Sequence, residues 1–250
     1  MKSILITGVS RGIGRTLATR FSSLGFKVYG VYKSSDEYKE EDALAAQLKQ
    51  ELPALNLLPY DLANRESISS IAGELAGIQM SGIIHNAAEF LENRFDELSA
   101  EVWDRSLAVN VTAPLLLTHT LSSQIIDSGS VVMIASTDAN YAAYDDIGYA
   151  ASKAALISIT KSLAAALAPR KIRVNAILPG WVDTQMAENA NISKHSAYQT
   201  PLGRNATTEE IADFVEYLVS DKSTFINAAA LTIDGGYSST DYTVKKESEQ

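Results

Sequence analysis

Tyr149 and Lys153 are the residues of this sequence whose types and spacing suit proton transfer best. They stand four positions apart in a helix-like segment, so their side chains share one helix face. A free phenol has a pKa of about 10, too high for efficient proton exchange at neutral pH. A nearby ammonium favours the phenolate and lowers that pKa. The pair is therefore predicted to protonate a carbonyl oxygen, or to deprotonate an alcohol in the reverse direction.

Two further polar residues are placed to serve the same reaction. Ser136 ends a strand-like run, at the sheet edge where open α/β folds bind ligands, so its hydroxyl could hold the substrate oxygen. Asn110 lies four residues before Pro114, which has no N–H to offer the Asn110 carbonyl. A helix kink there would leave that carbonyl to bind a water linking Lys153 to solvent. We expect Ser136, Asn110, Tyr149 and Lys153 to form one catalytic group.

A glycine-rich turn, Thr7–Gly14, follows the first strand-like run and leads directly into a helical segment. Glycines at this position let the backbone approach a pyrophosphate, which then lies at the positive N-terminus of the helix. A dinucleotide cofactor is therefore expected to bind the turn, at Gly8, Ser10, Arg11, Gly12, Ile13 and Gly14.

The end of the second strand-like run indicates which nicotinamide cofactor is used. Proteins selective for NAD place an acidic residue there to bind the ribose hydroxyls, but this chain has Tyr32 followed by Lys33. Lys33 together with Arg11 could hold a 2′-phosphate with two positive charges. The sequence therefore predicts NADP(H).

The same glycine turn also admits a hydrolase interpretation. Residues 8–12 match the G-x-S-x-G motif that places a nucleophilic serine, here Ser10, and His195 follows it in the chain order of a catalytic triad. Only one strand precedes Ser10, however, whereas the hydrolase fold needs an earlier strand and loop to supply an oxyanion donor. We therefore favour the dinucleotide interpretation.

The elements that must position these residues alternate between strands and helices, which predicts an α/β fold: a single-domain, doubly wound parallel sheet of Rossmann type with helices on both faces. The strand-like runs are 3–6, 27–32, 55–60, 82–85, 130–135, 173–178 and 230–233. The helical segments are about 12–24, 37–51, 65–76, 99–126, 149–168 and 208–220. We expect one domain over 1–237, a flexible tail over 238–250, and a mobile loop or lid over 184–200.

Composition excludes several function classes. The 250 residues contain no cysteine, so disulfides and thiolate metal sites are impossible, and we expect no metal centre. The net charge of −9 argues against a nucleic-acid partner. The N-terminus lacks a signal-peptide pattern and no apolar stretch reaches the roughly 18 residues of a membrane span. We therefore expect a cytoplasmic protein without a membrane partner.

Taken together, these segments resemble the short-chain dehydrogenase/reductase family from Thr7 to about Gly236. The glycine turn, the Tyr149–Lys153 segment and a serine thirteen residues before the tyrosine match its motifs. The resemblance implies that Tyr149 and Lys153 also touch the cofactor. It further implies cofactor contacts at Asp61 (to the adenine), Asn86, Ala87, Pro179, Gly180, Val182 and Thr184. His85 and Ala88 depart from the family motif; we interpret His85 as a polar residue at a strand end.

Among relatives, segments 173–180 and 233–236 look most like 3-oxoacyl-carrier-protein reductases. Asp138, Asp145 and Asp146 would repel an acidic carrier, however, so a small ketone, sugar or polyol is an equally open substrate. A nucleotide-binding redox sensor without turnover is the non-enzyme alternative, although such proteins typically lose the tyrosine or the lysine. The resemblance also implies a homotetramer or homodimer built on the 99–126 and 149–168 helices.

Overall fold

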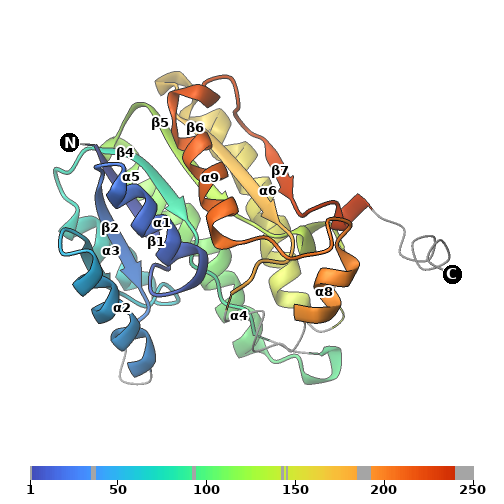
Figure 1. Cartoon of the computed structure of the whole chain (residues 1–250). Helices are drawn as coiled ribbons and strands as arrows, with labels where there is room; N and C mark the ends of the chain where they lie inside the picture. The colour runs from blue at the N-terminus through green and yellow to red at the C-terminus, as the bar shows by residue number, and fades with distance from the viewer. Residues whose placement is uncertain are drawn as a thin grey trace, which may run out of the picture.

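A computed structural model of the chain describes residues 2–34, 38–91, 94–141, 144, 146–184 and 193–239. It contains one seven-stranded parallel sheet in the order β3-β2-β1-β4-β5-β6-β7 (Figure 1). The strands are β1 (Ser3–Thr7), β2 (Lys27–Tyr32), β3 (Asn56–Pro59), β4 (Met80–His85), β5 (Ile125–Ile134), β6 (Arg173–Pro179) and β7 (Ala230–Ile233). The predicted fold class is confirmed.

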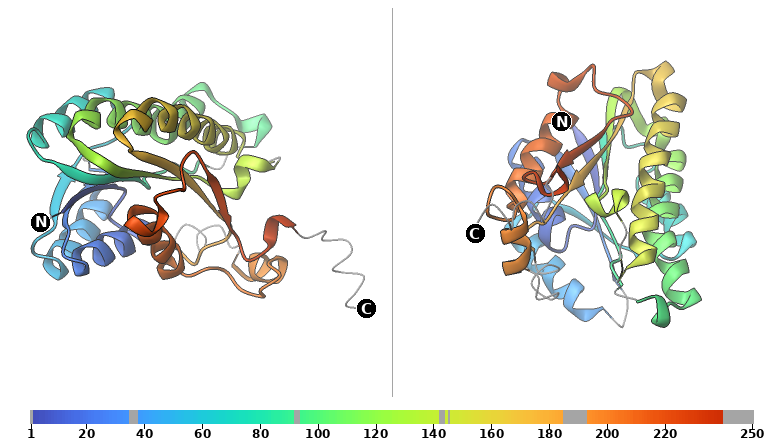
Figure 2. Two further views of the ribbon diagram at one scale, coloured as in Figure 1. Left: turned by 90° about the horizontal axis from the view of Figure 1, so that it is seen from above. Right: turned by 90° about the vertical axis from the view of Figure 1, so that its right-hand side faces the viewer.

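The helices form a layer on each face of the sheet, as Figure 2 shows. One layer holds α1, α2 and α9; the other holds α3, α4, α5 and α6. Their bounds are α1 (Gly12–Ser23), α2 (Lys39–Glu51), α3 (Arg65–Glu74), α4 (Ala100–Leu107), α5 (Ala113–Leu121), α6 (Ile147–Leu167) and α9 (Thr208–Val219).

Strand β1 illustrates how the sequence builds this three-layer core. Ile4, Leu5 and Ile6 are all fully buried. Leu5 packs into the core under α3 and α5, whereas Ile4 and Ile6 pack into the core under α1 and α9, because successive strand residues point to opposite faces. Each such burial contributes about 1.5–3 kcal/mol, so a continuous apolar run is what a sheet covered on both faces requires.

The order of the strands places a crevice at the middle of the sheet. β1 pairs with β2 on one side and with β4 on the other, so the chain leaves β1 in one direction and returns on the opposite side. In open parallel sheets, ligands bind outside the carboxyl ends of the strands at such a reversal. The glycine turn follows β1 at this point.

The segment around Asn110 departs from a regular helix, as its spacing to Pro114 predicts. α4 and α5 are joined by one π-helical stretch, Ala108–Thr112, in which the Ala113 N–H bonds the Ala108 carbonyl. Pro114 lies in the first turn of α5, where a missing N–H is tolerated. The irregularity is thus a π-turn, a feature that often marks functional positions.

Two segments differ from expectation. The polar 184–200 stretch contains a helix, α8 (Ser193–Gln199). Residues 185–192 of this stretch and 240–250 of the expected tail lie outside the described residues.

Ile147–Arg170, spanning α6, is long and apolar enough to cross a membrane by length and composition. Its buried face, which includes Lys153 and Thr160, instead faces the sheet.

Candidate active site

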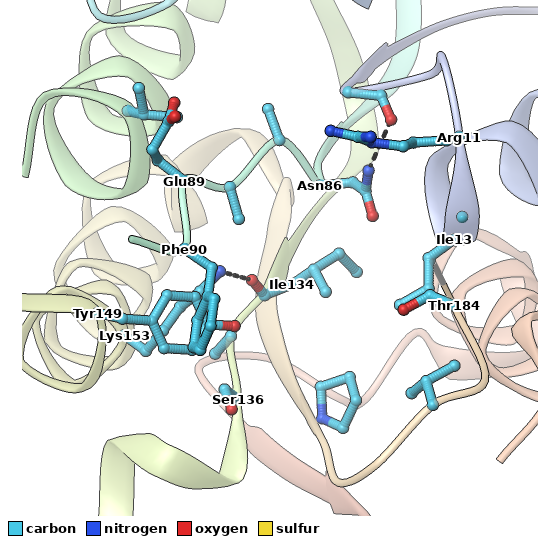
Figure 3. A pocket seen from close by; sticks show the side chains of 18 of the residues that line it. Arg11, Ile13, Asn86, Glu89, Phe90, Ile134, Ser136, Tyr149, Lys153 and Thr184 are labelled. Carbon is cyan, nitrogen blue, oxygen red and sulfur yellow. Dashed lines mark hydrogen bonds between the residues drawn. The ribbon is translucent and has the colours of Figure 1, made fainter. Parts of the chain in front are cut away.

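A pocket of about 330 Å³ opens at the carboxyl edge of the sheet. Its walls come from the loops after six strands, β1 to β6, so residues distant in sequence converge there. Figure 3 shows Tyr149, Lys153, Ser136 and Phe90 gathered at one end and Arg11 with Asn86 at the other. All predicted site residues line this pocket except Gly14 and Asn110, which lie behind its wall.

The glycine turn is shaped by close backbone approach. Gly8 has a φ of +76°, and a Cβ there would lie 2.8 Å from the Ala87 Cα. A Cβ on Gly14 would lie 1.8 Å from the Gly8 carbonyl oxygen, so neither position accepts a side chain. Asn86 fixes the turn by donating to the Thr7 and Gly8 carbonyls, each at 3.0 Å (Figure 3).

The N-terminus of α1 behind this turn suits a phosphate. Its N-cap residue, Arg11, makes no side-chain capping hydrogen bond. The first backbone N–H groups of a helix lack partners within the helix and carry the positive end of its dipole. The uncapped helix and the bare glycine backbone therefore fit the pyrophosphate of a dinucleotide.

Tyr149 and Lys153 project from the first turns of α6 toward Ser136. The helix begins at this point because the Asp146 carboxylate accepts a hydrogen bond from the Tyr149 N–H at 2.8 Å. Phe90 packs its ring edge-to-face against Tyr149, with 5.3 Å between ring centroids (Figure 3). The side chain of Lys153 is buried, and its Nζ donates to the Ile134 carbonyl at 2.7 Å.

The sequence predicted that Lys153 lowers the pKa of Tyr149, but the unliganded protein does not show this lowering. Enclosure in the pocket raises the pKa of Tyr149 well above its ordinary value, and the charge of Asp138 adds to this, while a hydrogen bond with Ser136 opposes it. Burial lowers the pKa of Lys153 to about 8. With this pKa, Lys153 has already lost its charge at the higher pH where Tyr149 titrates, so it does not lower the pKa of the phenol.

Ser136 lies two residues after the end of β5 and is buried. Its Oγ donates to Asp138 Oδ2 at 3.0 Å and accepts from the Asp138 N–H at 3.1 Å. Asp138 therefore orients the serine hydroxyl from inside the same pocket. Asp145, the other acidic residue predicted near this mouth, lies outside the described residues.

Asn110 contributes through its side chain rather than by lining the pocket. Its Nδ2 donates to Ser152 Oγ and to the Glu89 carbonyl, both at 3.0 Å, and its Oδ1 accepts from the Glu89 N–H at 2.8 Å. The π-turn thus ties the loop after β4 to helix α6, next to Lys153. The predicted water at the Asn110 carbonyl stays a prediction.

The other end of the pocket holds two cations, and each has a carboxylate partner. Arg11 pairs with Glu41 at 2.6 Å. Lys33 pairs with Glu89 at 3.2 Å, and its Nζ lies 3.4 Å from the centre of the Tyr38 ring. Sequence reasoning predicted the cations but missed both glutamates, which lie 30 and 56 positions away in the chain from their partners.

Asp61, predicted to contact the adenine, lines the pocket and is held by Arg105 at 3.2 Å and by the Ala63 N–H at 2.9 Å. Arg105 also pairs with Glu89 at 3.2 Å, so it links the loops after β3 and β4. The sequence alone does not indicate a role for Arg105 near the pocket, because only the fold brings α4 to these loops.

The remaining predicted cofactor residues follow β6 and β4. Val182 forms a parallel bridge with Ala206, which fixes the segment after β6. Thr184 lies over the glycine turn, 3.5 Å from where a Cβ on Gly12 would be. Pro179, Gly180 and Ala87 complete this part of the wall.

His85 is a buried residue at the end of β4, as expected. Its Nε2 lies 2.8 Å from Thr118 Oγ1, and burial lowers its pKa to about 3, so it stays neutral. The hydrolase interpretation gains no support, because the Ser10 hydroxyl donates to the Glu41 carboxylate. The side chain of His195, its other requirement, lies outside the described residues.

Comparisons with known proteins agree with this geometry. The family described as enoyl-(acyl carrier protein) reductase matches residues 8–238. A 3-oxoacyl-(acyl-carrier-protein) reductase of Aquifex aeolicus is 32% identical, over 94% of this chain and 96% of that protein. An NAD-dependent glycerol dehydrogenase of Listeria innocua is 30% identical, over 94% of this chain and 93% of that protein.

A solved structure adds a nucleotide complex to the comparison. The crystal structure of BdcA in complex with NADPH superposes with a TM-score of 0.85 at 28% identity, covering 94% of this chain and 93% of that one. The matched family, the relatives and the shared fold agree along nearly the whole chain. The chain is an oxidoreductase that belongs to the short-chain dehydrogenase/reductase family.

Proposed function

We propose that this protein transfers a hydride between NADP(H) and a carbonyl or secondary alcohol substrate, with Tyr149 as the proton-transferring acid and base. The observation that carries the proposal is that one pocket joins Ser136, Tyr149 and Lys153 to a bare glycine turn at a helix N-terminus. The nicotinamide supplies or accepts the hydride when bound.

Tyr149 donates its phenolic proton to the carbonyl oxygen in reduction and removes the hydroxyl proton in oxidation. Ser136 holds the same substrate oxygen by turning its hydroxyl proton from the Asp138 carboxylate to that oxygen, while the Asp138 N–H keeps its hydrogen bond to the serine Oγ. The high pKa of Tyr149 in the unliganded chain suits the donor direction, because the phenol keeps its proton until a negative oxygen develops beside it.

Lys153 has two roles in the proposed reaction. Its ammonium, buried behind Tyr149, favours negative charge at the tyrosine oxygen and contacts the cofactor. Its pKa near 8 lets it release and regain a proton close to neutral pH. Asn110 acts as a positioning residue, because it fixes Ser152, the neighbour of Lys153, and the Glu89 backbone.

The choice of NADP(H) rests on the end of β2. Tyr32 occupies the place where NAD-selective proteins carry an acidic residue, and Lys33 and Arg11 line the pocket beside it. The NADPH complex of BdcA supports this choice, whereas the NAD-dependent glycerol dehydrogenase is a relative with the other preference.

Two substrate classes are proposed. The reductase relatives favour a 3-oxoacyl thioester. Asp138, next to Ser136 in the pocket, favours a small neutral polyol, sugar or ketone, because its carboxylate can accept a hydrogen bond from a substrate hydroxyl and repels anions.

We also propose a homo-oligomer. Residues exposed on α5 and α6, among them Leu115 and Ala154, support one that is built on this helix layer.

A panel of carbonyl compounds and alcohols, each with NADPH or NADH and with the oxidised forms, tests the proposal by absorbance at the nicotinamide band. The panel includes 3-oxoacyl thioesters, ketoses and polyols. Turnover of one class with NADPH is the expected result. Tight nucleotide binding without turnover of any compound would favour the redox-sensor alternative.

A further inference from the structure

Glu41 is an acidic residue placed inside the cofactor pocket. It lies in the first turn of α2 and is only 7% exposed. Its carboxylate accepts a hydrogen bond from the Ser10 hydroxyl and pairs with Arg11 at 2.6 Å. Both partners belong to the turn predicted to bind the cofactor phosphates.

The burial of Glu41 shows that its two contacts matter to the pocket. An ionised carboxylate removed from water is costly unless it is paired and hydrogen-bonded, and here Ser10 and Arg11 meet that need. The Arg11 side chain is 47% exposed while that of Glu41 is 10% exposed, so the arginine is free to turn toward solvent or a ligand and the glutamate is not.

A second ion pair between the same two helices provides a contrast. Arg15 of α1 pairs with Glu51 of α2 at 2.6 Å, and neither residue lines the pocket. Glu51 has a side chain that is 46% exposed. The two pairs join the same region of the fold, but only the Glu41–Arg11 pair lines the pocket.

We propose that Glu41 is a specificity-determining residue that competes with the 2′-phosphate of NADPH for Arg11 and Ser10. The inference rests on the proposed function and refines its cofactor preference. When the phosphate arrives, Arg11 must exchange a buried carboxylate for a phosphate oxygen, and the carboxylate left behind repels the phosphate. NADH carries no such group and leaves the Glu41–Arg11 pair in place.

The second cation near the phosphate is balanced in the same way. Lys33 is paired with Glu89, and Arg105 with both Glu89 and Asp61. With the Arg11–Glu41 pair, three positive and three negative side chains at this end of the pocket cancel. The expected consequence is a modest preference for NADPH over NADH, less than about tenfold in Kd, although the end of β2 lacks an acidic residue.

The test is a binding titration followed by nicotinamide fluorescence, with wild type, Glu41→Gln, Glu41→Ala and the control Glu51→Gln. Both Glu41 variants should bind NADPH roughly tenfold more tightly than wild type and NADH within about twofold of it. Adenosine 2′,5′-bisphosphate and adenosine 5′-monophosphate are measured by their displacement of bound NADH; the bisphosphate should bind the Glu41 variants more tightly by the same factor, and the monophosphate should not. Glu51→Gln should leave all four ligands unchanged.

Equal changes for NADPH and NADH in the Glu41 variants, or the same gain in Glu51→Gln, would overturn the inference and leave the proposed function standing. So would a wild-type preference for NADPH clearly above about tenfold in Kd, a result that needs no variant. A wild type that binds neither nucleotide would refute the proposed function itself.

Discussion

Replacing Lys153 by Met should stabilise the unliganded protein while destroying its activity. The pKa of Lys153 falls from its ordinary 10.5 to about 8, and each pKa unit is worth about 1.4 kcal/mol, so the buried charge costs the fold about 3 kcal/mol at neutral pH. Methionine fills similar space without charge. It leaves the Ile134 carbonyl without its donor, at a cost of about 1 kcal/mol. The net gain is about 2 kcal/mol.

The stability advantage of Lys153→Met over the wild type should depend on pH. Below pH 8, Lys153 is charged in both the folded and the unfolded chain, and the full cost is present. Between pH 8 and 10.5 the unfolded chain binds more protons than the folded one, so the stability of the wild type rises with pH. The advantage of Lys153→Met should therefore shrink and vanish over that range.

The assay is chemical unfolding of both proteins at pH about 7 and about 10, without cofactor. Lys161→Met is the matched control, because Lys161 is exposed on the same helix and its replacement should change stability by less than about 0.5 kcal/mol. A Lys153→Met protein that is less stable than wild type at neutral pH, or equally favoured at both pH values, would refute the reasoning.

Three other changes test separate parts of the site. Asp138→Asn should lower the pKa of Tyr149 and move the rising limb of the pH profile for alcohol oxidation, where the Tyr149 phenolate forms, to lower pH. An unmoved profile would exclude the electrostatic link between Asp138 and Tyr149. The double variant Arg11→Ala, Lys33→Ala should raise the Kd for NADPH by roughly 10- to 100-fold in a binding titration and the Kd for NADH by far less. Equal increases for the two nucleotides would contradict the NADP(H) assignment. Pro114→Ala gives residue 114 an N–H that can bond the Asn110 carbonyl, so turnover should fall, while thermal stability should change by less than about 1 kcal/mol because Pro114 lies in the first turn of α5. Full activity would exclude the Asn110 carbonyl from the proton path.

Most of the sheet could be predicted from the sequence because its central strands are buried on both faces. Such strands must be short, apolar and rich in β-branched residues, as Ser130–Ile134 and Arg173–Leu178 are. The edge strands β3 and β7 are partly exposed and could be predicted from their short apolar runs between helical segments. The glycine turn and the Tyr149–Lys153 spacing could also be identified, because each depends on contacts between near neighbours in sequence.

Features that depend on distant contacts could not be predicted. Glu41, Glu89 and Arg105 read as ordinary helix or loop charges until the fold brings them to the pocket. The direction of the Tyr149 pKa shift was missed for the same reason, since it depends on enclosure and on Asp138. Helix α8 was missed because its polar sequence has no strong apolar periodicity.

The central claim, that Tyr149 transfers the proton, is tested most directly by Tyr149→Phe. The variant keeps the ring that packs against Phe90 and removes only the hydroxyl. Its turnover with the best substrate of the panel should fall by a factor of about 10²–10⁴, while its Kd for NADPH stays within about twofold of wild type. Turnover equal to that of wild type would contradict the mechanism.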